Sequence, residues 1–183
     1  MRRWNGWGSE ENHYPMPDGG SEFLSTRIGP GRVLEDATLA DVLSQVPSSR
    51  LPEHPLIDRD PDTRIRHARG QSLPDWLAMR SGDFDVFPDG VAFPESPEDI
   101  RALLAEAHRE GWLLIPYGGG TSVAGHVTPA KGGRPILTIS LSRMNQLLEI
   151  DPVSQIATFG PGTKGPDVEA QLKPHGFVLG HYP

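Results

Sequence analysis

The amino-acid sequence predicts an α+β fold in which a small mixed sheet is flanked by helices. Three observations carry this prediction: short apolar runs recur after residue 90, a helix with complete start and stop signals lies between two of them, and a second helical segment follows the last run. At 183 residues the chain is long enough for a domain with a hydrophobic core and too short for a large multidomain enzyme.

The first 70 residues are expected to form an N-terminal extension that wraps the domain formed by residues 71–183. Residues 9–69 are rich in proline, glycine and charge, and only residues 37–46 show apolar side chains at helical spacing. This composition favours a segment that packs on a neighbour over one that builds a core of its own.

Four elements are expected between residues 72 and 115. Residues 72–80 predict a short helix with Pro74 in its first turn, and residues 90–93 predict a short strand. The next helix has Ser96 as N-cap, Pro97 at its first position and Gly111 at its end, and its apolar residues share one face. Residues 112–115 predict a strand parallel to residues 90–93, because a helical crossover joins parallel strands.

Three strands and a helix are expected in the rest of the chain. Residues 136–141, 146–151 and 155–159 alternate as strands do, and residues 151–154 form a turn between the last two. Residues 165–175 predict a helix capped by Thr163, with Val168 and Leu172 facing inward and Gly176 at its end.

The stretch from residue 112 to residue 125 predicts a binding site for a diphosphate. Glycine permits positive φ and carries no Cβ, so successive N–H groups from Gly118 to Ser122 are expected to converge on an anion. The hydroxyl groups of Thr121 and Ser122 add donors, and Val123 is expected to pack behind them. A glycine-rich surface turn is the alternative. The candidate binding residues are Pro116, Tyr117, Gly118, Gly119, Gly120, Thr121, Ser122 and Val123.

A second glycine motif, residues 160–165, fits the dinucleotide pattern G-x-G-x-x-G between a predicted strand and a predicted helix. The sequence ends within about twenty residues of it, before an acidic ribose partner is placed. A tight strand-to-helix turn is therefore the favoured interpretation.

Composition excludes several classes of protein. A net charge of -7 argues against a nucleic-acid groove, and the absence of cysteine excludes disulfides and thiolate sites. No apolar run approaches the ~20 residues of a transmembrane helix, so a cytoplasmic protein is expected. No His, Asp and Glu spacing indicates a metal site. Arg64, Arg66 and Arg69, around His67, are expected on a solvated or ion-paired face, with phosphate binding as the alternative.

Residues 116–125, preceded by residues 91–100, resemble the FAD-binding domain of the vanillyl-alcohol oxidase and p-cresol methylhydroxylase flavoproteins. Residues 3–8, 142–145 and 176–183 narrow this resemblance to the alkyldihydroxyacetonephosphate synthase subgroup and bacterial FAD-linked oxidases. The resemblance covers residues 63–183 almost continuously, whereas residues 9–62 match poorly.

The resemblance implies the first half of a p-cresol methylhydroxylase-type FAD-binding domain, whose glycine loop receives the FAD diphosphate. Some members of the family link the flavin to a histidine or a cysteine. Gly120 stands where that histidine would be and the chain has no cysteine, which implies noncovalent FAD. Members of the subgroup are several hundred residues longer, so an N-terminal fragment is expected. Its catalytic residues are unknown; His181 and Tyr182 have suitable chemistry but are expected to line the approach to the flavin or to belong to the broken end.

The implied function is the FAD-binding part of a flavin-dependent oxidoreductase or of an alkylglycerone-phosphate synthase-like enzyme. The substrate in a full-length form would be a small organic acid or an alkyl-glycerone phosphate. The alternative is a noncatalytic fragment or a subunit of a split flavoprotein, which serves as a nucleotide-binding or assembly module. A complementary C-terminal half or a second copy of the chain is the expected protein partner.

Overall fold

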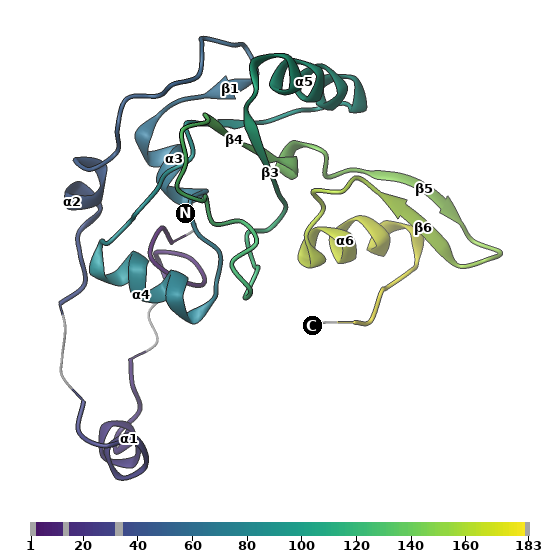
Figure 1. The fold of residues 1–183 in the computed structure, drawn as a ribbon. Coiled ribbons are helices and arrows are strands. Elements are labelled where there is room, and N and C mark those ends of the chain that lie inside the picture. The colour runs from purple at the N-terminus through teal and green to yellow at the C-terminus, as the bar shows by residue number, and fades with distance from the viewer. Residues whose placement is uncertain (1–2, 13–14, 32–34, 182–183) are drawn as a thin grey trace.

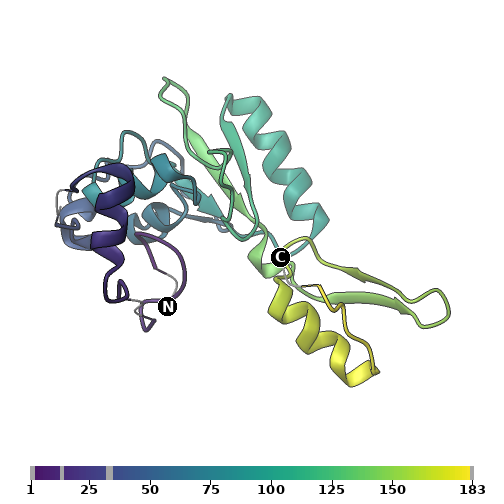
Figure 2. The same ribbon diagram turned by 90° about the horizontal axis from the view of Figure 1, so that it is seen from below.

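The structure is a computed structural model that describes residues 3–12, 15–31 and 35–181. These residues form a four-stranded mixed sheet, a separate two-stranded ribbon and the helices around them. Figures 1 and 2 both place the ribbon and its helix to one side of the larger sheet. The predicted small mixed sheet flanked by helices is therefore confirmed, although the strands are divided between two sheets.

The larger sheet contains β1 (Ile57–Asp58), β2 (Gly90–Ala92), β3 (Leu113–Tyr117) and β4 (Ile136–Ser140), in the order β1-β2-β4-β3. β2 and β3 both pair in parallel with β4, and β1 pairs antiparallel with β2. All five residues of β4 are buried, as expected for a central strand covered on both faces. β3 lies at the edge, which is where a sheet tolerates a proline such as Pro116.

Helix α5 (Pro97–Glu110) forms where its boundary signals predict it. Ser96 and Asp99 make a reciprocal capping box, and Gly111 ends the helix in the left-handed region with φ of 72°. Leu103 and Ala107 pack against a core that includes residues 137 and 139 of β4. Because side chains alternate along a strand, residues 136, 138 and 140 face the opposite side of the sheet.

The N-terminal part of the chain holds more structure than its composition predicts. It contains α1 (Gly20–Ile28), α2 (Leu39–Leu43), α3 (Pro61–Arg66) and the edge strand β1, and it is followed by α4 (Leu73–Ser81). Helix α2 is shorter than the expected 37–46, because Thr38 caps it. A second core gathers side chains from both sides of residue 70: Trp4, Val42, Ile65, Ala68, Met79, Phe84 and Phe87. The domain boundary at this residue stays a prediction.

The C-terminal part forms the ribbon of β5 (Leu147–Asp151) and β6 (Ile156–Phe159), followed by α6 (Gly165–Leu172). The expected turn between the strands is present, with the Asp151 carboxylate accepting hydrogen bonds from the amides of Val153 and Ser154 at 2.9 and 3.1 Å. Thr163 does not cap α6. Lys164 occupies the N-cap position, and the Thr163 hydroxyl donates instead to the Gly160 carbonyl at 2.7 Å.

Two short 3-10 helices complete this part of the chain. η1 (Leu141–Arg143) follows β4, and η2 (Lys173–His175) follows α6. The expected helix over residues 165–175 is therefore an α-helix that tightens in its last turn, and Gly176 ends it with φ of 79°. No helix in the described part of the chain is both long and apolar enough to cross a bilayer.

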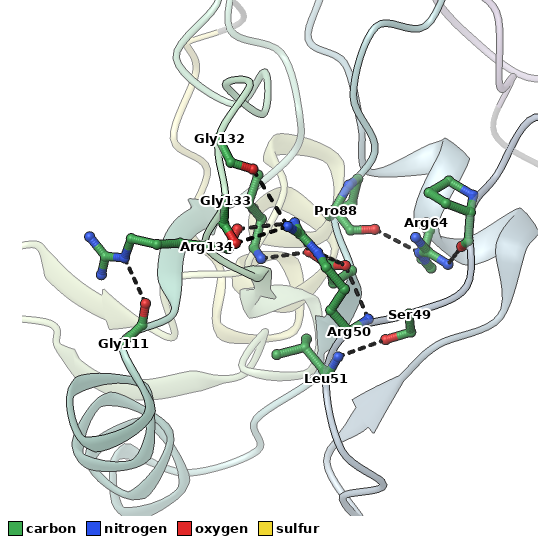
Figure 3. Close-up of polar contacts among 12 residues, drawn as sticks. Ser49, Arg50, Leu51, Arg64, Pro88, Gly111, Gly132, Gly133 and Arg134 are labelled. Carbon is green, nitrogen blue, oxygen red and sulfur yellow. Dashed lines mark hydrogen bonds and ion pairs between the residues drawn. The ribbon is translucent and has the colours of Figure 1, made fainter.

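A buried ion pair joins the N-terminal segment to the larger sheet (Figure 3). The Arg50 guanidinium donates to both oxygens of the Asp89 carboxylate at 2.8 and 2.7 Å, and the Ile136 amide donates to the same carboxylate at 2.8 Å. Arg50 also donates to the Arg134 carbonyl at 3.0 Å. The carbonyls of Gly132, Gly133 and Arg134 thus tie the segment before β4 to Arg50 and the sheet.

Two of the three clustered arginines lie in the interior and not on a solvated face. Only 2% of Arg64 is exposed; its guanidinium donates to the carbonyls of Pro88 at 2.6 Å and Pro47 at 2.7 Å (Figure 3). Burial lowers the pKa of Arg64, against the opposing attraction of Asp89. Arg69 is also buried, whereas Arg66 is ion-paired as expected.

Candidate functional site

The glycine loop, residues 118–128, leaves the larger sheet at the carboxyl edge of its parallel strands. Tyr117 at the end of β3 pairs with Ser140 at the end of β4, and Ala92 at the end of β2 pairs with Ile139. Three strand ends therefore lie at one edge of the sheet, and the loop follows the end of the outermost one, β3. In open α/β sheets this edge, where neighbouring strands leave a crevice, is the usual place for a ligand.

The wall behind the loop is aromatic. Tyr117 is buried, and its ring lies 4.7 Å from the ring of His67, which also lies 5.6 Å from the ring of Phe93. The Tyr117 hydroxyl donates to the Arg66 carbonyl at 3.2 Å. Tyr117, just before the loop, is thus anchored to the last residue of α3. The neighbouring Pro116 is exposed.

The three consecutive glycines differ in their surroundings. Gly120 is buried and takes the left-handed conformation with φ of 67°, which an L side chain rarely adopts. Gly118 and Gly119 are exposed, and a Cβ built on Gly118 meets no atom within 4 Å. The protein's own packing therefore requires glycine at position 120, whereas at position 118 it leaves open space in front of the backbone.

The loop also presents unused hydrogen-bond donors. Within the described part of the chain, the backbone N–H groups of Gly119, Thr121 and Ser122 donate to no other protein group. Thr121 is exposed. A bare backbone with unpaired amides beside open space suits an anionic group such as a diphosphate. The residues present therefore fit the group that the sequence predicts.

Ser122 has two internal roles. Its hydroxyl oxygen accepts hydrogen bonds from the amides of Ala124 at 3.4 Å and His126 at 3.2 Å, which closes the turn after the glycines. Its carbonyl accepts a hydrogen bond from the Gln71 amide at 2.7 Å. The motif predicts Ser122 only as a donor, through its N–H and its hydroxyl, and these acceptor roles are not expected from it.

Val123 does not pack behind the loop, contrary to expectation. Its side chain is 75% exposed, because the turn closed by Ser122 directs residues 123–126 to the surface. The apolar anchor is Val127, which is buried. His126 is exposed.

The second glycine motif serves packing between backbones. A Cβ on Gly160 would clash with the Met144 carbonyl, and one on Gly162 would clash with the Leu141 carbonyl. The Gly162 amide donates to Met144 at 2.9 Å. The preceding strand β6 pairs only with antiparallel β5, so this turn lacks the parallel sheet of a dinucleotide fold. The interpretation as a tight strand-to-helix turn is confirmed.

The side chains of the clustered arginines do not form a second anion site. Arg64 points at interior carbonyls and Arg66 pairs with Asp62 and Glu10, so the three arginines do not converge on one phosphate. His181 is exposed, and Tyr182 lies outside the described residues.

Gly70 and Asp75, which contact the loop, and Thr128, which bonds to Asp75, are not among the residues that the sequence predicts. The pattern Ser72-x-x-Asp75 signals a capping box, and the structure contains one. No local signal links Asp75 to Thr128, whose hydroxyl donates to its carboxylate at 2.8 Å across 53 residues.

Comparison with known proteins gives relatives that share this architecture. Alkyldihydroxyacetonephosphate synthase from Dictyostelium discoideum is 28% identical over 99% of this chain and 36% of the relative. The synthase of the same name from Trypanosoma brucei brucei is 35% identical over 68% of this chain and 21% of the relative. The chain thus spans about a third or less of the length of these relatives.

The fold comparison agrees. A solved structure of alkyldihydroxyacetonephosphate synthase matches the whole of this chain with a TM-score of 0.78 and 25% identity, and the match covers 40% of that structure. The family model described as FAD binding domain matches residues 88–183, a little more than half of the chain. This match contains β3, the glycine loop and the C-terminal ribbon. The chain therefore belongs to the family of FAD-binding domains.

Proposed function

We propose that the glycine loop holds the diphosphate of FAD on its backbone amides. The observation that carries this proposal is the set of unpaired N–H groups of Gly119, Thr121 and Ser122, which lie beyond the carboxyl edge of the parallel strands and next to the open space in front of Gly118. Family membership identifies the cofactor as FAD. The proposed binding residues are Pro116, Tyr117, Gly118, Gly119, Gly120, Thr121, Ser122 and Val123.

The roles within this set follow from the geometry. Gly119, Thr121 and Ser122 supply N–H donors, and Gly120 provides the backbone conformation that turns them outward. Tyr117 anchors the loop, and Val123 presents an exposed apolar surface to the ligand. We propose that FAD is bound noncovalently, since the family resemblance implies that Gly120 stands where a linking histidine would be and the sequence has no cysteine. Bound FAD supplies redox chemistry that amino-acid side chains lack.

The test is an absorbance spectrum of the purified chain after addition of FAD and removal of the excess. We expect a retained and perturbed flavin band, which Gly119→Asp abolishes because its carboxylate repels the diphosphate. Gly133→Asp is the matched control, since it adds the same charge at an exposed glycine with no atom within 4 Å of its Cβ position. Retention of FAD by Gly119→Asp at the level of Gly133→Asp would overturn the proposal.

For the whole protein we propose a flavoenzyme that acts on an alkyl-glycerone phosphate. Support comes from the relatives and the solved structure, which carry the name alkyldihydroxyacetonephosphate synthase. An oxidoreductase that acts on a small organic acid is the other branch. The test is co-expression of this chain with the C-terminal part of a relative, followed by separate assays for ether-lipid product and for flavin reduction by 2-hydroxy acids. Formation of reduced flavin without ether-lipid product would favour the second branch.

A protein partner is proposed for the C-terminal ribbon. A two-stranded sheet is marginal by itself, and both edges of β5–β6 lack a neighbouring strand in the described structure. Leu148, Val153 and Ile156 are exposed on it. These features support the expected partner, either a complementary half or a second copy of the chain. Sedimentation of the chain alone distinguishes the two, because only the second copy gives a dimer. The expected cytoplasmic location likewise stays a proposal.

A further inference from the structure

Residues 66–75 contact the glycine loop at three points along its length. The Tyr117 hydroxyl donates to the Arg66 carbonyl at 3.2 Å, the Gln71 amide donates to the Ser122 carbonyl at 2.7 Å, and the Thr128 hydroxyl donates to Asp75 at 2.8 Å. The contacts fall just before the loop, in its middle and at its end. They come from the end of α3, from the segment that joins α3 to α4 and from the first turn of α4, all outside the loop itself.

The middle contact requires close approach of two backbones. A Cβ on Gly70 would lie 2.5 Å from the Ser122 carbonyl oxygen and 3.2 Å from Val127, so only glycine fits at this position. Gly70 and Val127 are both buried. The loop therefore rests directly on the backbone of residues 70–71, with no side chain between them.

The Asp75 carboxylate bonds to Ser72 at the start of α4 and to Thr128 at the end of the loop, and so links the helix to the loop. One carboxylate oxygen accepts hydrogen bonds from the amide and hydroxyl of Ser72 at 3.3 and 2.6 Å, which completes the capping box of α4. The other oxygen accepts the hydroxyl hydrogen bond of Thr128. Asp75 is 4% exposed, so water does not readily replace either partner.

We propose that residues 66–75 form a brace that holds the glycine loop in its donor-presenting shape before the cofactor arrives, with Asp75 and Thr128 as positioning residues. The effect of the brace on FAD affinity rests on the proposed function; its effect on the loop does not. A ligand that binds only the ordered loop has its apparent Kd divided by the fraction of molecules in which the loop is ordered. Loss of one brace contact lowers that fraction and raises the apparent Kd in proportion.

The test uses Thr128→Val, which removes the hydroxyl donor and keeps the size of the side chain. Its matched control is Thr63→Val, because the Thr63 hydroxyl also donates to an aspartate, Asp58, at 2.8 Å but does not touch the loop. In the free chain we expect hydrogen exchange of the hydrogen-bonded amides of Gln71, Ala124 and His126, whose acceptors all belong to Ser122, to rise on the order of fivefold in Thr128→Val and to stay unchanged in Thr63→Val. Thr128→Ser, which restores a hydroxyl, should return the rate to that of the unaltered chain.

The FAD measurement is made in parallel. The dissociation constant should rise in Thr128→Val, by at most the factor seen in exchange, without a matching rise in Thr63→Val, even where the two variants lose similar thermal stability. If the amide hydrogen-exchange rates were equal in Thr128→Val and Thr63→Val, the proposed brace would be contradicted. If the unaltered chain binds no FAD, the proposed function fails alone, because the exchange rates of the free chain still decide whether the brace exists.

Discussion

Replacement of Asp89 by asparagine should strongly destabilise the fold, because this buried carboxylate is the centre of the ion pair with Arg50. It accepts hydrogen bonds from the Arg50 amide at 3.2 Å, from two nitrogens of the Arg50 guanidinium and from the Ile136 amide. The Asp89 side chain is 4% exposed. Asparagine keeps one acceptor oxygen and places an NH2 group against at least one donor.

The magnitude follows from what remains buried after the change. Breaking a buried pair costs about 3–5 kcal/mol when the partner is left uncompensated, and a buried amide without an acceptor costs about 1–3 kcal/mol. The Arg50 side chain is 42% exposed, so water solvates part of its charge in the variant. We therefore expect a loss of about 2–4 kcal/mol, a large share of the ~5–15 kcal/mol that a domain of this size possesses.

The assay is urea unfolding followed by tryptophan fluorescence, since Trp4 and Trp112 are buried in the two cores. The matched control is Asp85→Asn, which breaks an ion pair with Lys131 whose side chains are 65% and 71% exposed. The control should change the free energy of unfolding little, because water replaces the lost partner. If Asp89→Asn destabilised the chain no more than Asp85→Asn, the assignment of a structural ion pair would be refuted.

The same carboxylate predicts part of the pH dependence of stability. Burial raises the pKa of Asp89, but hydrogen bonds from Arg50 and the Ile136 amide outweigh burial and leave the pKa below its ordinary value. The unfolded chain then binds the proton more readily, so this contribution is fully present above the unfolded pKa of ~3.9 and is lost as pH falls through the lower folded pKa. Asp89→Asn should therefore show a shallower loss of stability below about pH 4 than the unaltered chain. Parallel curves for the two proteins would contradict this assignment.

Three further substitutions test other parts of the structure. Leu103→Ala should cost about 2–5 kcal/mol in urea unfolding, because Leu103 is fully buried between α5 and the sheet. Gly162→Ala should loosen the C-terminal ribbon, seen as faster hydrogen exchange of β6, because its Cβ clashes with the Leu141 carbonyl; unchanged exchange would contradict the close approach. Gly118→Ala should change the free energy of unfolding by no more than about 0.5–1 kcal/mol, because its Cβ meets no atom. It should still weaken FAD binding, and a normal FAD affinity would exclude this position from the site.

Local signals predicted the elements that depend on neighbours in sequence. Ser96 and Gly111 bound α5 as expected, because an N-cap and a left-handed C-cap act within one turn of the helix. The expected turn at residues 151–154 is likewise present, because the Asp151 carboxylate bonds to amides two and three residues ahead. Three strands of the larger sheet lay close to their expected positions for a similar reason, since their apolar runs are continuous or alternating.

Interactions between distant residues account for what the sequence did not reveal. The pattern contains no sign that β4 inserts between β2 and β3, or that β5 and β6 leave the sheet. Arg64 reads as a surface charge, yet its partners are carbonyls 17 and 24 residues away. The candidate loop was found from its glycines, whereas its contact with Asp75 crosses 53 residues and has no local signature.

The proposed contact between the glycine loop and the FAD diphosphate is tested most directly by NMR titration of the labelled chain. Backbone amide shifts are followed on addition of FAD and, separately, of riboflavin, which has no phosphate. We predict that FAD shifts the amides of Gly119, Thr121 and Ser122 most strongly and that riboflavin leaves them unmoved. FAD binding that shifts amides elsewhere and leaves residues 118–122 unchanged would contradict the account.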